Sequence, residues 1–287
     1  MEKKTVKLNV PYEKAGLSSE GCFPELDIYI ISQYDKIAVK RRPAIIICPG
    51  GGYEFCSVRE AEPVAIRFAS YGISAFVLRY SCVNKKFPTA LLEAAQAMAY
   101  VRKNAEEFGI DPERIMICGF SAGGHLAASL SVHWNKPFIT KILGGNSETY
   151  RPSGAILCYP VITAGEKRHD GSIVNIAGTE YSPEIMKMIS LEEHVSPDTP
   201  PTFIWHTADD NSVPVENTLL YASALAANGV PFACHIFEHG VHGLSLCDET
   251  TAGYEGHLNP DCARWAAMAA EWVKRGAPAG NVDPYRQ

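Results

Sequence analysis

Short apolar runs rich in β-branched residues alternate along the chain with longer alanine-rich stretches. Most of the short runs contain almost no polar residues, which is typical of parallel strands that are buried on both faces. Strands that alternate with helices predict an α/β fold, in which helices cover both faces of a mostly parallel sheet. The strands expected from this pattern are residues 26–31, 44–48, 73–78, 115–120, 155–159, 203–207 and 233–237.

The alanine-rich stretches predict the helices. Gly229 and Gly276 follow two of them, at the position where a glycine commonly ends a helix. Two segments of alternating polarity near the N-terminus, 5–10 and 26–31, predict antiparallel edge strands ahead of the parallel part. The expected helices are residues 60–70, 91–108, 122–132, 216–228 and 262–274.

One interval interrupts this regular alternation. Residues 160–201 contain no clear strand and one short helical pattern at 183–189. Long intervals of this kind in a compact domain tend to be lids or binding loops. We expect either such an insertion or a solvated surface excursion, within a single domain of residues 1–287.

The composition narrows the choice of partners. Apolar residues make up 46% of the chain and charged residues 20%, with a formal charge of −6. Without a broad positive field, neither nucleic acid nor a membrane surface is expected as a partner. No signal-peptide pattern and no apolar run of about 20 residues is seen. The nine cysteines form no Cys-x-x-Cys pair and several lie in apolar runs, which favours a reducing cytoplasm; a homodimer is left open.

The segment GFSAG at 119–123 carries the first candidate chemistry. It follows an apolar strand pattern and opens an alanine-rich helix pattern, which is the context of a Gly-x-Ser-x-Gly nucleophile elbow. Such a turn would lift the hydroxyl of Ser121 above the sheet edge, at the positive end of a helix. The same segment approximates a phosphate-binding loop, but Ser121 replaces its middle glycine, so a nucleotide site is not favoured.

Three glycines follow the strand at 44–48. They allow backbone N–H groups to face a ligand with no side chain between them. Where a nucleophile lies on such an elbow, this loop supplies half of the oxyanion hole and the amide after the nucleophile supplies the rest. We therefore expect Gly51, Gly52 and Ala122 to donate their N–H groups to the substrate carbonyl; a flexible turn is the alternative.

A serine nucleophile needs a base, and the base needs a carboxylate that orients it. The chain order Ser, Asp, His points to the ends of the strands 203–207 and 233–237. Asp210, three residues before Val213, is favoured as the acid over Asp209, which we interpret as a turn or cap residue. His242, flanked by glycines, is favoured as the base.

The remaining histidines are interpreted as structural. His239 is expected to make a local hydrogen bond in its loop, and His125 to pack under the elbow. A metal site could gather His235, His239 and His242, but no His-Glu-x-x-His motif is present. We expect neither a metal nor a cofactor.

Together these motifs resemble those of α/β-hydrolases of the esterase/lipase type, close to the BD-FAE group and to acetyl xylan esterases. The resemblance covers about residues 25–275. One departure is Pro49, which stands where lipases commonly have a histidine; it leaves the backbone donors in place. The segments that carry the resemblance are PGGGY at 49–53, GFSAGGHLA at 119–127, CYPV at 158–161, HTADD at 206–210 and HGVHG at 239–243.

The resemblance implies hydrolysis of acyl esters, often of acetyl groups on plant oligosaccharides. The expected function is that of a serine carboxylesterase for short-chain acyl esters, acting on a small-molecule or oligosaccharide ester through an acyl-enzyme. Rivals are a serine peptidase or amidase, a metal-dependent deacetylase and a non-catalytic binding protein. The aromatic residues expected near the cleft, as sugar-stacking or pocket-lining groups or as ordinary core residues, are Tyr53, Phe55, Tyr159 and Tyr181.

Overall fold

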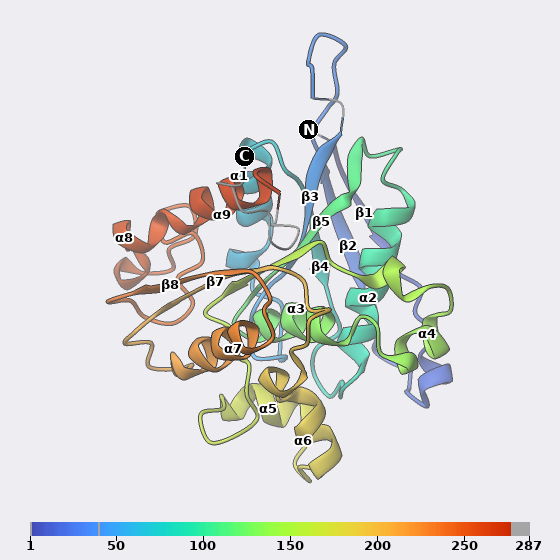
Figure 1. Cartoon of the computed structure of the whole chain (residues 1–287), viewed down its shortest axis with the longest axis vertical. Coiled ribbons are helices and arrows are strands. Elements are labelled where there is room, and N and C mark those ends of the chain that lie inside the picture. Colours follow the sequence, from blue (N-terminus) through green and yellow to red (C-terminus); the bar gives the residue numbers. More distant parts are fainter. Residues whose placement is uncertain (1, 40, 277–287) are drawn as a thin grey trace.

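One mixed sheet organises the computed structural model, which describes residues 2–39 and 41–276 (Figure 1). Within these residues the sheet has eight strands in the order β1-β2-β4-β3-β5-β6-β7-β8. The strands from β3 to β8 pair in parallel, whereas β2 pairs antiparallel with both β1 and β4. The predicted α/β class with antiparallel N-terminal strands is confirmed. The bounds are β1 Glu2–Lys7, β2 Glu25–Ile30, β3 Arg42–Cys48, β4 Ser74–Arg79, β5 Ile110–Phe120, β6 Gly154–Cys158, β7 Thr202–Thr207 and β8 Phe232–Phe237.

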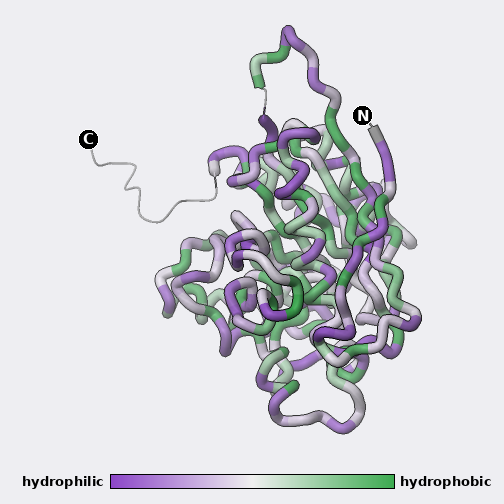
Figure 2. The backbone as a smooth tube through the Cα atoms, turned by 90° about the vertical axis from the view of Figure 1, so that its right-hand side faces the viewer, coloured by the Kyte–Doolittle hydropathy of each residue, from purple (hydrophilic) through white to green (hydrophobic). Residues whose placement is uncertain are grey.

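Helices cover both faces of the sheet. Successive residues of a strand point to opposite faces, so in β3 Ile46 packs in one hydrophobic cluster while Ile45 and Ile47 pack in another. The first cluster includes buried residues of α2, α3 and α7, and the second those of α1 and α9. Figure 2 shows hydrophobic stretches inside the fold and many hydrophilic turns at its periphery. The helices are α1 Glu62–Ser70, α2 Thr89–Lys103, α3 Ala122–His133, α4 Pro137–Leu143, α5 Asp170–Ala177, α6 Pro183–Ile189, α7 Glu216–Ala227, α8 Pro260–Ala263 and α9 Trp265–Lys274.

Several predicted elements differ from the observed ones: the strand expected at 115–120 begins at Ile110, and the helix expected at 262–274 is divided into α8 and α9. Two further differences at element ends have a plain physical explanation. The edge strand expected at 5–10 is β1, which ends at Lys7, because its partner β2 begins only at Glu25, after Pro24. Proline has no N–H to add to the ladder. The helix expected at 91–108 ends at Lys103, yet Phe108 is still buried in the core. The apolar pattern of this segment therefore continues past the end of the helix into the turns that follow it.

The interval 160–201 holds two α-helices and one 3-10 turn. The helix predicted at 183–189 is confirmed as α6, and α5 was not predicted. The two helices contact each other and lie together below α3 in Figure 1. The turn η4, Leu191–His194, begins with a hydrogen bond from the Leu191 N–H to the carbonyl of Ile162.

No helix within residues 2–39 and 41–276 combines the length and the apolar character needed to cross a lipid bilayer.

Two fully buried histidines on α3 make the stability of the fold depend on pH. His125 bonds to Tyr53 and to the Ile189 carbonyl, and His133 donates from Nε2 to the Met188 carbonyl at 2.9 Å. Burial lowers the pKa of His125 to about 4 and that of His133 to about 3. Below the unfolded pKa of about 6.5 the unfolded chain therefore binds protons that the folded chain excludes, and stability falls with falling pH.

We expect His133→Asn to make this pH dependence weaker. Asparagine does not titrate. Between about pH 4.5 and 6, the slope of the free energy of unfolding against pH should therefore be smaller than in the wild type by about 1.4 kcal/mol per pH unit. Urea unfolding at several pH values measures the slope. In His239→Asn the slope should stay as in the wild type, because the 75% exposed His239 ring is protonated in both states over this range. Equal slopes for wild type and His133→Asn would refute the prediction.

Candidate active site

Ser121 occupies a strained turn between β5 and α3. Its φ of 53° and ψ of −119° lie in a region that residues with a side chain rarely adopt. The turn is tight enough to require glycines on both sides. A Cβ on Gly119 would lie 2.0 Å from the carbonyl oxygen of Gly123, and one on Gly123 would lie 2.1 Å from that of Cys48. The predicted elbow geometry at this segment is confirmed.

Hydrogen bonds join Ser121 to two residues from distant loops. The Ser121 hydroxyl lies 2.8 Å from Nε2 of His242, and Nδ1 of the same ring lies 2.7 Å from Oδ2 of Asp210. With Nδ1–H donated to the carboxylate, Nε2 is free to accept the serine proton. Asp210 follows β7 and His242 follows β8, and parallel strands bring both loops to the same sheet edge as the elbow. The structure thus brings together the three side chains singled out as nucleophile, base and acid.

The surroundings of Asp210 keep its carboxyl group ionised. The side chain is fully buried, which opposes ionisation. Hydrogen bonds from His206 and His242 outweigh this cost and hold the pKa of Asp210 well below its usual range. Its second oxygen, Oδ1, accepts the backbone N–H groups of Ser212 and Val213, both at 2.9 Å.

His206 is a site residue that the sequence analysis missed. It lies in β7, and its Nε2 is 3.2 Å from Oδ2 of Asp210 and 3.0 Å from the Val213 carbonyl. Its Nδ1 is 2.8 Å from the hydroxyl of Thr218 on α7. These partners fix the ring against the carboxylate. A polar residue inside an otherwise apolar buried strand was the available signal.

The residues that were not favoured as the acid, the base or metal ligands make other contacts. Asp209 accepts the Gly240 N–H at 2.7 Å and lies 3.0 Å from Nδ1 of the exposed His239, which matches the expected local roles of both. His235 packs against the ring of Phe203. Among the described residues, no group of three or more His, Cys, Asp or Glu side chains is arranged to hold a metal ion.

The glycine loop lies next to the elbow. Its turn is closed by the Phe55 N–H, which donates to the Gly51 carbonyl at 3.2 Å. Asn175 of α5 donates from Nδ2 to the Gly52 carbonyl at 2.8 Å, so the helix in the long interval holds this loop. Within the described part of the chain, the N–H groups of Gly51, Gly52 and Ala122 have no protein acceptor, as donors kept for a ligand require.

A buried carboxylate supports both the loop and the base. Glu60, at the end of the turn η2 (Val58–Glu60), accepts the Gly50 N–H at 2.8 Å with one oxygen and the Tyr159 hydroxyl at 2.6 Å with the other. The Ser245 N–H donates to that hydroxyl. The Tyr159 ring packs edge-on against the His242 ring, with 5.2 Å between the ring centroids. Burial raises the pKa of Glu60, while these hydrogen bonds favour its ionised form. The sequence analysis gave no indication of this network.

The expected substrate contacts are revised by burial. Tyr53 is 3% exposed and its hydroxyl is bonded to His125, while Tyr159 is 2% exposed and bonded to Glu60. Neither ring offers a face to a ligand, because the core covers both. Phe55 is 58% exposed, so its role as a substrate contact stays a prediction. Tyr181 stacks under the Arg168 guanidinium at 5.4 Å.

Comparison with known proteins places the chain among esterases. The BD-FAE family model matches residues 26–225. The chain is 38% identical to endo-1,4-beta-xylanase B of Butyrivibrio fibrisolvens and 32% identical to an acetylxylan esterase of Xylanibacter ruminicola. These matches cover 83% and 77% of this chain but only 38% and 45% of the relatives, so the chain spans less than half of their length.

Two solved structures are similar over most of their length. An acetyl ester-xyloside bifunctional hydrolase from Caldicellulosiruptor lactoaceticus is 40% identical, with a TM-score of 0.77 over 88% of both chains. The carboxylesterase Cest-2923 from Lactobacillus plantarum is 29% identical, with a TM-score of 0.82 over 98% of this chain and 100% of that one.

The Glu60 network predicts an effect on the chemistry of Ser121. Glu60→Gln keeps the shape of the side chain but cannot accept from both donors, so the glycine loop and the Tyr159 ring should lose their alignment. We expect covalent labelling of Ser121 by a fluorophosphonate, which reacts with activated serines, to slow about tenfold. Glu62→Gln, an exposed neighbour paired with Lys3, is the matched control and should label at the wild-type rate. Equal labelling rates in Glu60→Gln and wild type would exclude this role.

Proposed function

The chain belongs to the BD-FAE family of α/β-hydrolase esterases, and we propose that it is a serine carboxylesterase with Ser121, His242 and Asp210 as its catalytic triad. The observation that carries this proposal is the continuous chain of short hydrogen bonds from the serine hydroxyl through the imidazole to the buried carboxylate. That arrangement activates a hydroxyl that would otherwise be a poor nucleophile.

The reaction proceeds in two stages. The Ser121 oxygen attacks the ester carbonyl while His242 Nε2 takes its proton, which forms a tetrahedral intermediate. His242 then gives the proton to the leaving alcohol, and the acyl group stays on Ser121 as an ester. Water, deprotonated by His242, attacks the acyl-enzyme, and His242 returns that proton to the Ser121 oxygen as the acid leaves. The ionised Asp210 stabilises the imidazolium in both stages.

The oxyanion of each tetrahedral intermediate needs donors already in place. The N–H groups of Gly51, Gly52 and Ala122 serve this role, and each well-aimed donor is worth about 3 kcal/mol in the transition state. Glu60 and Asn175 hold the two ends of the glycine segment from outside the site. The strained backbone of Ser121 places the nucleophile next to the first amide of α3.

We assign the substrate to short-chain acyl esters of carbohydrates, with acetylated xylo-oligosaccharides first among them. This rests on the names of two relatives, an acetylxylan esterase and an acetyl ester-xyloside bifunctional hydrolase, and on the exposed Phe55 ring beside the glycine loop. The cytoplasmic location expected from the cysteines stays a prediction, as does the single domain. The homodimer stays open.

His169 is proposed to contact the alcohol part of the substrate. It caps α5, and its Nδ1 accepts the Ser172 N–H at 3.2 Å, so the neutral ring carries its proton on Nε2. The Ser172 hydroxyl lies 2.9 Å from Nδ1 of His169 and would be 4.0 Å from a Cβ on Gly52, so His169 lies near the glycine loop. Burial, followed by repulsion from His242, lowers the pKa of His169. A half-buried N–H donor beside the site suits a sugar hydroxyl.

The triad predicts a sharp contrast between adjacent residues. Ser121→Ala should lower kcat for p-nitrophenyl acetate by about 10⁴-fold or more, and Asp210→Asn by about 10³-fold or more, because the base loses its orientation. Asp209→Asn should retain wild-type turnover, since Asp209 is exposed and contacts only the His239 loop. Turnover of matched amide substrates at the ester rate would favour a peptidase or amidase. Wild-type-like activity in Ser121→Ala would end the proposal.

His169 predicts a substrate-dependent effect. His169→Ala should raise KM for acetylated xylo-oligosaccharides by about tenfold, the cost of about one lost hydrogen bond to the sugar. For p-nitrophenyl acetate, whose alcohol has no such hydroxyl, KM and kcat should stay near wild type. Steady-state kinetics with both esters give the comparison. An equal rise in KM for both substrates would argue against a contact with the alcohol part.

A further inference from the structure

Two thiols outside the proposed catalytic chain face each other across a surface groove. The sulfur atoms of Cys56 and Cys82 are 3.9 Å apart, and both residues are partly exposed. They line a groove of about 410 Å³ together with Phe55, Val58 and Tyr80. Cys56 lies between the glycine loop and η2, whereas Cys82 follows β4. A reagent in solvent can therefore reach two thiols that come from separate segments.

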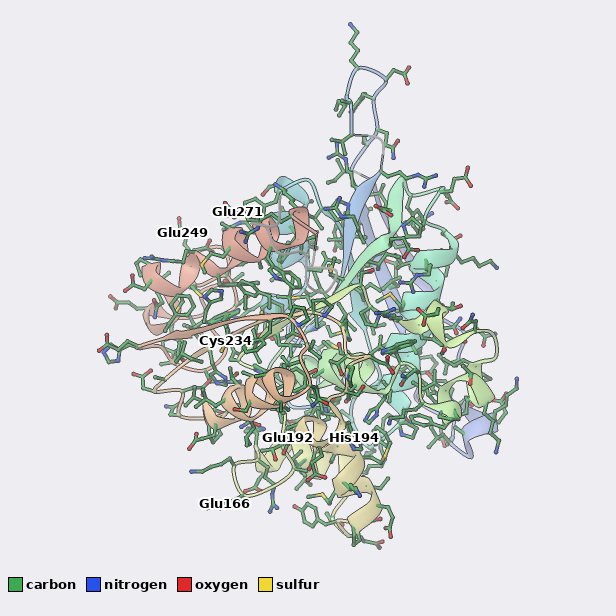
Figure 3. The ribbon with its side chains drawn as sticks, viewed as in Figure 1. Glu166, Glu192, His194, Cys234, Glu249 and Glu271 are labelled. Atoms are coloured by element: carbon green, nitrogen blue, oxygen red, sulfur yellow. The ribbon has the colours of Figure 1, made fainter. Side chains whose placement is uncertain are left out.

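Other cysteine pairs lack this access. Cys118 and Cys158, on the neighbouring strands β5 and β6, interact through their thiols but are fully buried. Cys247 and Cys262 also interact and are buried. Cys234 is partly exposed but lies on β8, where Figure 3 labels it. Among the described residues, close approach and solvent access coincide at the Cys56–Cys82 pair.

The two thiols are not equivalent. A hydrogen bond from the Cys82 thiol lowers the pKa of Cys56, although burial opposes this, and the same interaction raises the pKa of Cys82. Both sulfur atoms also lie within 3.5–3.6 Å of the Tyr80 carbonyl oxygen. Cys56 is thus the better nucleophile and Cys82 its proton-bearing neighbour.

Cys56 is directly connected to the proposed oxyanion loop. The residues on either side of it donate backbone hydrogen bonds into that loop, from Phe55 to the Gly51 carbonyl at 3.2 Å and from Ser57 to the Gly50 carbonyl at 2.9 Å. The contact between Gly51 and Phe55 is tight, because a Cβ on Gly51 would lie 2.2 Å from the Phe55 oxygen. A displacement of Cys56 therefore moves Gly50 and Gly51 as well.

We infer that Cys56 and Cys82 are a redox modification site, which a peroxide converts into a disulfide that lowers the activity of the neighbouring serine site. The Cys56 thiolate attacks the peroxide oxygen and becomes a sulfenic acid, while the other oxygen leaves as water or an alcohol after taking a proton. The Cys82 sulfur then attacks the sulfenic sulfur, loses its proton, and a second water leaves. Two thiols are oxidised and one peroxide is reduced.

Formation of the Cys56–Cys82 disulfide requires the loop around Cys56 to move. A disulfide has a sulfur–sulfur distance of about 2.05 Å, so the two sulfur atoms must approach by roughly 2 Å. Part of this approach displaces the segment that holds Gly50 and Gly51, which misaligns the oxyanion donors. This activity effect rests on the proposed esterase function, whereas formation of the disulfide does not.

The experiment treats the full chain with hydrogen peroxide and follows three quantities. Thiol titration should show the loss of two thiols, and peptide mass mapping should find Cys56 joined to Cys82 with the loss of two hydrogens. Turnover of p-nitrophenyl acetate should fall about tenfold, because a misplacement of the donors by an ångström or more costs at least this much. Dithiothreitol should restore both the thiols and the turnover.

Variants identify the residues responsible. Cys56→Ser and Cys82→Ser should each keep their turnover after peroxide, while Cys234→Ser, the matched control, should lose turnover as the wild type does. A bridge at other cysteines, or a Cys56–Cys82 bridge with unchanged turnover, would overturn the inference. A reduced enzyme without any ester turnover would contradict the esterase proposal instead, and the thiol count and mapped bridge would still decide whether the disulfide forms.

Discussion

The hydrogen bond between Asp210 and His242 is the interaction on which the rest of the site depends. It fixes the tautomer that leaves Nε2 of His242 facing the Ser121 hydroxyl. A buried carboxylate stays ionised only if donors surround it, and here two backbone amides, His206 and His242 supply them. The turn after β7 and His206, which Thr218 of α7 holds, keep this desolvated anion in place.

Regular features of the fold could be predicted because they depend on local patterns. Buried parallel strands have apolar runs, and the order of residues along a parallel sheet brings Ser121, Asp210 and His242 to one edge. The choice of Asp210 over Asp209 followed from its position before Val213. Burial of single aromatic rings depends instead on tertiary packing. Of the two roles expected for Tyr159, a substrate contact or a core residue, the structure shows the core position, where the hydroxyl bonds to Glu60.

The supporting residues escaped prediction for the same physical reason. Glu60 lies in the mostly polar stretch SVREAE at 57–62, which does not indicate burial, and its partner Tyr159 is 99 residues away in sequence. His206 meets Asp210 only because the loop after β7 folds back over the strand. The short helix α5 has no strong pattern of its own, yet Asn175 connects it to Gly52. Such contacts depend on the tertiary fold, and no local sequence pattern indicates them.

Two carboxyl groups support the proposed base, one by direct contact and one through another residue. Asp210 bonds directly to the ring, whereas Glu60 acts through Tyr159 and through the loop amide of Gly50. The segment that carries the proposed oxyanion donors bonds to the Glu60 carboxyl group at Gly50 and continues to the partly exposed Cys56. Hydrogen bonds hold this segment at Gly50 and at the residues on either side of Cys56, so we expect a displacement at either end to shift the amides between them. In the proposed mechanism, the position of these glycine amides therefore affects the rate together with the triad.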